Sequence, residues 1–298
     1  MEKIFLDTDL GYDCDDVGAL SILNNFKNKG LCDIVGITHS SYFNPTGVKA
    51  IQAVNSFFKN DDIKIGYSDN TKQLNNKLVP NAYNDALINH FYKKESKFYP
   101  STELLLTELL KEEDNSIVYV GIGMFTNLAN AYAFKNDKLN GKEILNKKIK
   151  EIVLMGGDFS TQMPEFNIKS DIESAKFLLE NCPKSTYFLD FVVGASVISG
   201  TPFINDDTPV GLSYKIFSNG GRESRDPLTM LYALKHDCDL FKVSNSGKVT
   251  ILDDGSTIFK EDTSCNHHLI SLNKPIEEVQ NRLNKYMEGN LWKKVFYQ

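Results

Sequence analysis

Five aspartates fall within ten residues near the start of the chain: Asp7, Asp9, Asp13, Asp15 and Asp16. They bridge an apolar, strand-like run and the first turn of a segment whose apolar residues recur at helical spacing. Two carboxylates about 4 Å apart repel by about 4 kcal/mol at an effective dielectric near 20. Carboxylates that converge at a sheet edge therefore need protons or a cation, and oxygen ligands suit a hard ion such as Ca²⁺ or Mg²⁺. The cluster predicts a divalent metal site.

Two other interpretations of this cluster compete with the metal site. Some of the acids could cap the following helix, where negative charge is favourable, while the rest stay solvated. An apolar strand followed by Asp-x-Asp also resembles the start of haloacid-dehalogenase-type phosphatases, in which the first aspartate, here Asp7, is a nucleophile. That pattern usually has Thr or Val two residues after the second aspartate, where this chain has Gly11. It also leaves Asp13, Asp15 and Asp16 unexplained, so we rank it below the metal site.

Strand-like and helix-like segments alternate along the whole chain. Apolar runs predict strands at residues 3–9, 33–38, 63–66, 116–121, 150–155 and 186–190, and a hairpin at 248–252 and 256–259. Helical spacing predicts helices at residues 16–26, 45–58, 104–110, 127–134, 171–180, 226–234 and 276–287, with Asp226 as the N-cap of its helix. Residues 68–99 are poorly periodic and predict a lid or a surface loop. The alternation predicts one large α/β domain over residues 1–298, with a mainly parallel central sheet flanked by helices. Ligands of such folds bind beyond the carboxyl ends of the strands.

Composition excludes several classes of function. The formal net charge is −6, with no basic stripe, which argues against a nucleic-acid partner. No apolar run reaches about 18 residues, so we expect no membrane span. The N-terminus lacks the pattern of a secretory signal, and the five cysteines are scattered without a CxxC pair. We therefore expect a cytoplasmic protein with reduced thiols.

Several motifs resemble one known family. Residues 7–20 read DTDLGYDCDDVGAL, which is similar to DTDxGxDDxxAL, the signature of the inosine-uridine nucleoside hydrolases. Four further segments follow in the family's order: GIGMFTNLA at 121–129, IVLMGG at 152–157, PEFN at 164–167 with acids at 171 and 173, and RDPL at 225–228. They resemble GPLTNLA, IVLMGG, AEFNxxxDPEAA and HDPL. Each short motif is weak alone, but their joint order makes the match specific over most of the chain.

The resemblance implies hydrolysis of the N-ribosyl bond of a nucleoside or related riboside, with Ca²⁺ as cofactor and a homodimer or homotetramer as assembly. Asp9 is implied as general base. The implied metal ligands are Asp9, Asp15, Asp16, Asp226 and the backbone carbonyl of Thr126. The implied ribose contacts are Asp15, Met155, Glu165 and Asn167. Cleavage of such a bond passes through an oxocarbenium-like sugar, and contacts that strengthen in that state are the ones that accelerate the reaction.

The chain departs from the family pattern in three places. Two extra residues follow Asp9, so either Asp13 or Asp15 can take the first position of the family's Asp-Asp pair. Ser40-Ser41 stands roughly where the family has Gly-Asn. Arg225 replaces the histidine that helps to protonate the leaving base in purine-accepting members, and arginine stays charged and is a poor proton donor.

The change at Arg225 leaves three interpretations open. Arg225 could bind an anionic group of the substrate, because a guanidinium suits bidentate contacts, or it could pair with a nearby acid such as Glu223. Another acid could replace the histidine, and the candidates by residue type are Tyr83, His90, His267 and His268. The alternative to an enzyme is a non-catalytic, metal-dependent protein that binds a ribosyl ligand. Retention of Asp9 favours the enzyme, since a binding protein needs no base.

Overall fold

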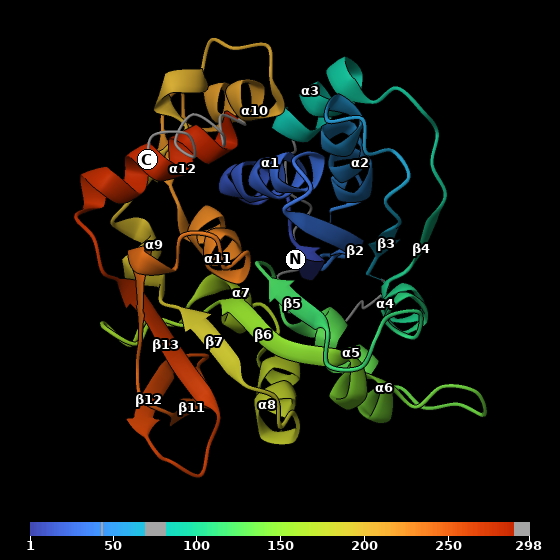
Figure 1. Cartoon of the computed structure of the whole chain (residues 1–298), viewed down its shortest axis with the longest axis vertical. Helices are drawn as coiled ribbons and strands as arrows, with labels where there is room; N and C mark the ends of the chain where they lie inside the picture. The colour runs from blue at the N-terminus through green and yellow to red at the C-terminus, as the bar shows by residue number, and fades with distance from the viewer. Residues whose placement is uncertain (43, 69–81, 289–298) are drawn as a thin grey trace.

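An eleven-stranded sheet runs through the centre of this computed structural model, which describes residues 1–42, 44–68 and 82–288 (Figure 1). The parallel strands are β4 (Phe98–Pro100), β3 (Ile65–Tyr67), β2 (Cys32–His39), β1 (Glu2–Thr8), β5 (Ile117–Gly121), β6 (Ile149–Met155), β7 (Thr186–Leu189) and β13 (His267–Leu272), in that spatial order. The antiparallel strands at the far end are β10 (Phe241–Val243), β11 (Gly247–Ile251) and β12 (Thr257–Glu261). A separate two-stranded ribbon joins β8 (Ile198–Ser199) and β9 (Arg222–Glu223).

Strand β1 lies near the middle of the sheet, and later strands are added on both sides of it. The chain adds β2, β3 and β4 on one side of β1, then returns to add β5, β6 and β7 on the other. At such a switch point the connections leave in opposite directions, which opens a crevice at the carboxyl ends of the two central strands. β1 and β5 are those strands, so the residues that follow them are placed at the mouth of the crevice.

Helices cover both faces of the sheet, and the alternation of side chains along the strands decides which core each residue joins. Ile4 and Leu6 of β1 pack with the helices on one face, while Phe5 packs on the other. The first face carries α1 (Asp15–Asn28), α2 (Gly47–Phe57), α3 (Ala82–Phe91), α10 (Pro209–Phe217), α11 (Arg225–Ala233) and α12 (Ile276–Met287). The second carries α4 (Ser101–Leu109), α5 (Thr126–Ala133), α6 (Gly141–Lys148) and α8 (Ile172–Asn181), in the lower part of Figure 1. Short helices α7 (Phe166–Lys169) and α9 (Phe191–Ala195) follow β6 and β7.

The predicted fold class is confirmed: the chain forms one α/β domain with a large, mainly parallel sheet between helices. The predicted hairpin is present as β11 and β12, and the helix at 276–287 has the predicted bounds. The sequence analysis did not predict α6, α10 or β13. β13 begins with His267-His268, whose polar character hid a strand that is stabilised by pairing with β7. In the described residues no helix has the length and apolar character needed to cross a membrane.

The poorly periodic stretch at 68–99 is only partly a loop. Residues 69–81 of this prediction lie outside the described residues. Beyond them, α3 packs against α2 and α10, and β4 closes the edge of the sheet. The sequence analysis did not predict α3 because the apolar residues of AYNDALINHF alternate with polar ones over a short stretch; the helix buries Tyr83, Leu87 and Phe91 in the core. The described part of this stretch therefore contributes a packed helix and an edge strand to the fold.

Candidate active site

A cavity of about 310 Å³ lies at the carboxyl ends of β1, β5 and β6. Eight of its lining residues were predicted as site residues from the sequence: Asp9, Asp15, Asp16, Met155, Glu165, Asn167, Arg225 and Asp226. The others are Tyr12, Asp13, Ile122, Phe166, Phe191 and Arg222. Segments separated by more than 200 residues in sequence thus meet at the switch point of the sheet, where ligands of such folds bind.

Three carboxylates in this cavity converge on one point. Asp15, Asp16 and Asp226 each offer an oxygen, and these oxygens all lie within 4.8 Å of one another. Asp15 and Asp16 form the first turn of α1, and the backbone N–H of Asp226, in the first turn of α11, donates to Asp15 at 3.1 Å. Two packed helices therefore point their N-termini at the group, which favours negative charge there. A buried, oxygen-only donor set of this kind fits a divalent cation such as Ca²⁺.

The structure distinguishes Asp15 from Asp13. Asp13 turns to Arg222, whose Nε lies 2.9 Å from both carboxylate oxygens and whose Nη2 lies 2.6 Å from one of them. Asp15 is instead buried beside Asp16 and Asp226. The extra length of the β1–α1 loop is absorbed by Asp13 and Cys14, and Asp15 takes the place next to the other acids.

Burial makes the charges of this cluster costly. Desolvation raises the pKa of Asp15 to about 7, with the charge on Asp13 as the next cause. It also raises the pKa values of Asp16 and Asp226 well above the usual range, and the carboxylates around them add to the rise. The positive charge of Arg225 opposes the rise in the pKa of Asp15 and of Glu165. The acids therefore lack sufficient positive charge from the protein itself.

Asp9 stands at the bottom of the cavity, one residue after β1 ends. It is 4% exposed, and burial, followed by the charges of Asp15 and Glu165, raises its pKa well above the usual range. The loop that leaves it turns at Gly11, whose φ of +124° is open to glycine and strained for other residues. A Cβ at Gly11 would also lie 1.9 Å from the amide of Asn44. The chain can therefore turn sharply from Asp9 toward α1.

The PEFN segment supplies two residues to the opposite wall. The Glu165 carboxylate caps α7 by accepting from the backbone N–H groups of Asn167 and Ile168 at 2.9 and 3.2 Å, and it accepts from Gly157 at 3.3 Å. The Asn167 amide donates to the carbonyls of Ile122 and Met155 and contacts the Met155 sulfur at 3.3 Å. These bonds fix both side chains at the cavity before any ligand arrives.

Thr126 does not share the cavity with the other predicted residues. It is fully buried as the first residue of α5, its hydroxyl bonds to Asp171 at 2.5 Å, and it is absent from the described residues that line the cavity. The N-cap assigned to Asp226 is wrong, because α11 begins at Arg225 with Ser224 in the cap position. The N-cap of α11 lies two residues earlier than the Asp-Pro pair suggested.

Asp7 is placed unlike a phosphatase nucleophile. It is 1% exposed, and one of its oxygens accepts from Asn127 at 2.8 Å and from Thr38 at 2.5 Å. It also lies behind the cavity and is not among the described residues that line it. A nucleophile must face its substrate, so this arrangement counts against the haloacid-dehalogenase interpretation.

None of the four alternative proton donors lines the cavity in the described structure. Tyr83 is buried and donates to the backbone carbonyl of Asp13 at 2.6 Å, and His90 is an exposed partner of Asp207. His267 and His268 lie on β13, remote from the acids. Tyr12 does line the cavity with its phenol, and the sequence analysis did not predict it although it follows Gly11. Its hydroxyl bonds to Ser41 at 2.9 Å, and its ring lies 5.2 Å from that of Phe166.

Arg225 is 9% exposed and packs its guanidinium over the ring of Phe191, 4.2 Å from the centroid. Its Nη2 donates to Glu223, as one of the sequence interpretations expects. Phe191 and Phe166 line the cavity as well, and neither was predicted. Phe191 directly follows the predicted strand that ends at Asp190, and Phe166 directly follows Glu165 in the PEFN segment. Their positions next to predicted elements were therefore the signal by which the sequence could have identified them.

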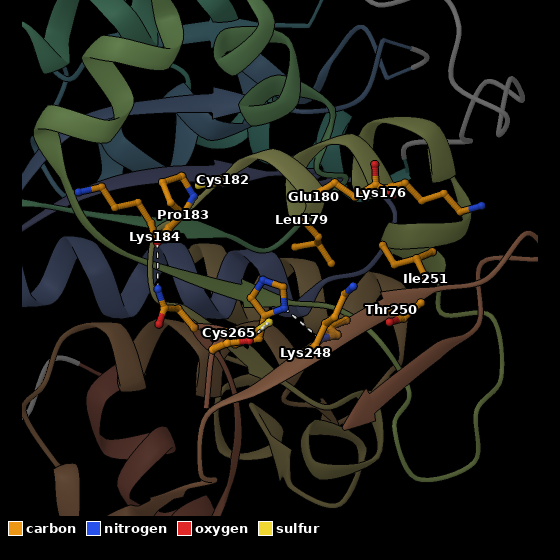
Figure 2. A pocket seen from close by; sticks show the side chains of 14 residues that line it. Lys176, Leu179, Glu180, Cys182, Pro183, Lys184, Lys248, Thr250, Ile251 and Cys265 are labelled. Carbon is orange, nitrogen blue, oxygen red and sulfur yellow. Dashed lines mark hydrogen bonds between the residues drawn. The ribbon is translucent and has the colours of Figure 1, made fainter. Parts of the chain in front are cut away.

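A larger cavity of about 450 Å³ lies between α8 and β11 (Figure 2). Lys176 on α8 and Lys248 on β11 stand on opposite sides of it, and Lys184, Cys182 and Cys265 complete its rim in the close-up. It opens where β7 and β13 begin, at the amino ends of strands. Lys176 is already paired with Asp253 at 2.6 Å, and no group of converging acids is found there among the described residues. The smaller cavity is therefore the candidate active site.

Comparisons with known proteins identify the family and the fold of the chain. The sequence model of the family described as inosine-uridine preferring nucleoside hydrolase matches residues 4–282. Among curated protein sequences, none matches this chain. Among solved structures, a plant nucleoside hydrolase is 18% identical with a TM-score of 0.75, covering 96% of this chain and 98% of its own. The inosine-uridine preferring nucleoside hydrolase from Bacillus anthracis is 21% identical with a TM-score of 0.75, covering 97% and 98%.

The same fold also occurs in a protein of another description. The type III effector XopQ, solved with adenosine diphosphate ribose, is 14% identical with a TM-score of 0.71, covering 97% of this chain and 94% of its own. At these identities the structural likenesses establish the fold, whereas the family model spans most of the sequence. The chain belongs to the inosine-uridine preferring nucleoside hydrolase family.

Proposed function

We propose that this protein hydrolyses the N-ribosyl bond of a riboside, with Ca²⁺ held by Asp9, Asp15, Asp16 and Asp226. The observation that carries the proposal is the convergence of Asp15, Asp16 and Asp226 within 4.8 Å, in the cavity that Asp9, Glu165 and Asn167 also line. Membership of the nucleoside hydrolase family supports the reaction class. The backbone carbonyl of Thr126 stays a proposed ligand by resemblance alone.

The cavity residues fit the steps of this hydrolysis. The oxygen of a water bonds to C1′ of the ribose while the bond from C1′ to the base nitrogen breaks, and that electron pair leaves with the base. Asp9 takes the proton from the water, and the departing base takes its proton from solvent. Glu165 and Asn167 accept or donate hydrogen bonds at the ribose hydroxyls, which strengthen as positive charge develops on the sugar. A Ca²⁺ held by Asp15, Asp16, Asp226 and Asp9 would lower the pKa of the attacking water and keep Asp9 ionised.

The second candidate is a protein that binds a ribosyl ligand without cleaving it. The solved structure of XopQ with adenosine diphosphate ribose favours keeping this candidate, since it pairs the fold with a bound ribosyl compound. The presence in the cavity of a carboxylate that can act as a base, Asp9, supports the enzyme.

A reducing-sugar assay over a panel of ribosides, with 1 mM of each and Ca²⁺ present, separates the two candidates. We expect release of ribose from at least one riboside, and Asp9→Asn is the matched inactive variant. Tight binding of a riboside with no ribose released above the Asp9→Asn background would contradict hydrolysis. Size-exclusion chromatography of the same preparation tests the proposed homodimer or homotetramer.

A further inference from the structure

Arg225 is one of two arginines in a cavity that is lined by six carboxyl side chains. Its guanidinium lines the cavity, yet its Nε has no hydrogen-bond partner among the described residues. A buried N–H without a partner is destabilising, and native structures satisfy most such groups. A side chain with a purely structural role would be expected to bind its surroundings more completely.

The Arg225 side chain rests in a cradle built by α9. The Phe191 ring lies under the guanidinium, and Gly194 lies against the base of the side chain. A Cβ added at Gly194 would come within 2.6 Å of Cα and Cγ of Arg225. The absence of a side chain at this position allows α9 to approach closely, which fixes the direction in which Arg225 extends.

Arg222 and Arg225 differ in how far their charge is already used. Arg222 forms a bidentate pair with Asp13, so its fork is occupied. Arg225 binds Glu223 through Nη2 and approaches Asp13 only at 3.9 Å through Nη1. Its partner Glu223 is about one-third exposed and can exchange that contact for water at little cost. Arg225 is therefore the guanidinium with capacity for a ligand.

We propose that Arg225 selects ribosides that carry an anionic group, a phosphate or a carboxylate, which it binds through charge-assisted hydrogen bonds. This inference rests on the proposed function, because it concerns the substrate class of the same cavity. A planar guanidinium suits either anion in a two-point contact. Phe191 holds the plane in position, and the bound cation expected at the acids would remove their repulsion toward an anionic substrate.

The test compares ligands that differ only in the anionic group. Ribose 5-phosphate against ribose probes a phosphate, and nicotinate riboside against nicotinamide riboside probes a carboxylate on the base. Calorimetry in saturating Ca²⁺ measures all four affinities for wild type, Arg225→Gln, Arg225→Lys and Glu223→Gln. Arg282→Gln is the matched control, since Arg282 is a comparable ion-paired arginine on α12 outside the cavity.

We expect wild type to bind the anionic member of at least one pair about 10- to 100-fold more tightly, as charged hydrogen bonds allow. Arg225→Gln abolishes that preference, Arg225→Lys retains part of it, and Glu223→Gln increases it by removing the competing carboxylate. Arg282→Gln leaves it unchanged. Equal affinities within both pairs, or a preference that survives Arg225→Gln, would overturn the inference. So would an equal loss for neutral and anionic ligands, which is the result of a structural role.

Ribose and ribose 5-phosphate have no N-ribosyl bond, so their binding is measured independently of turnover and the two proposals can fail separately. If no riboside is cleaved but the anionic preference is present and depends on Arg225, the hydrolase proposal fails and the inference holds for a ligand-binding protein. If neutral ribosides are cleaved as well as anionic ones and bind equally, hydrolysis holds and the anionic substrate class is wrong.

Discussion

Calcium removal should destabilise the protein by an amount that follows from the geometry of its acids. The oxygens of Asp15, Asp16 and Asp226 lie within 4.8 Å of one another. If all three are ionised, each pair repels by at least about 3.5 kcal/mol at an effective dielectric of 20, or about 10 kcal/mol in total. Protonation relieves part of this in the metal-free protein. A cation that binds only the folded state removes the repulsion and stabilises the fold.

The expected size of the calcium effect follows from mass action. At a free Ca²⁺ concentration 1,000-fold above its Kd, the free energy of unfolding rises by about 4 kcal/mol. For a chain of this length that corresponds to an increase of about 6 °C in Tm. Thermal unfolding of chelator-treated protein at pH 8.5, without metal and with Ca²⁺ or Mg²⁺, measures the effect. The smaller Mg²⁺ holds its own waters more tightly, so we expect it to stabilise less.

Asp226→Asn should stabilise the metal-free protein, whereas removal of calcium should destabilise the wild type. No side-chain hydrogen bond of Asp226 would be lost among those found in the described residues, and one charge of the cluster disappears. The Tm of the metal-free protein should therefore rise, while the increase on adding Ca²⁺ shrinks or vanishes. Asp62→Asn, which removes an exposed carboxylate, is the control and should change neither value by more than about 1 °C. A wild-type Tm that ignores Ca²⁺, or an Asp226→Asn variant less stable without metal, would refute the reasoning.

Three further predictions concern catalysis and pH. Asp9→Asn should lower riboside turnover by at least about 10²- to 10⁴-fold without unfolding the protein, measured by ribose release alongside circular dichroism; comparable turnover would exclude Asp9 as the base. Because Arg225 is a poor acid, turnover of p-nitrophenyl riboside should exceed that of inosine by about two to four orders of magnitude, with Arg225→His narrowing the gap, and equal turnover would mean that another acid serves. Burial lowers the pKa of His267 to about 4, so the fold binds the neutral imidazole that accepts from Val249. Below pH 6.5 the folded protein then binds fewer protons than the unfolded chain, so stability decreases as the pH is lowered. Between pH 6.5 and 4.5 the stability advantage of wild type over His267→Gln in denaturant unfolding should shrink by about 2 kcal/mol, with His268→Gln as the control. A difference that does not change with pH would contradict this prediction.

The central strands and the site motifs were predictable because their signals are local. β1 and β5 are nearly continuous apolar runs, as strands buried on both faces must be, and Asp9 follows β1 directly. The rule that ligands meet the carboxyl ends of parallel strands then places Asp9, after β1, and Met155, at the end of β6, beside one cavity, whereas Asp226 was implied by the family resemblance alone. Elements such as α10 and β13 escaped prediction because their stability comes from partners far away in the chain, chiefly α3 and β7.

The choice between Asp13 and Asp15 shows what the sequence could not supply. Both residues are aspartates in the same loop, and residue type alone treats them alike. The distinction depends on Arg222, which lies 209 residues further along the chain and reaches Asp13 through the folded structure. Likewise, the pairing of Arg225 with Glu223 was one of several open interpretations, whereas its stacking on Phe191 had no sequence signal at all.

Asp13, Arg222 and Arg225 together determine how charge is distributed in the cavity. Six carboxyl side chains line it, those of Asp9, Asp13, Asp15, Asp16, Glu165 and Asp226, against two guanidinium groups. Six negative and two positive charges give a formal charge of −4, and Arg222 removes Asp13 from the sum as a neutral pair. Three backbone N–H groups stabilise Glu165 in place. The unmatched negative charge is thereby concentrated on the aspartates around the proposed calcium position, while the remaining positive group, Arg225, packs over Phe191 and pairs with Glu223. A cation bound among the aspartates and an anionic substrate group bound by Arg225 would complement both kinds of charge that line this cavity.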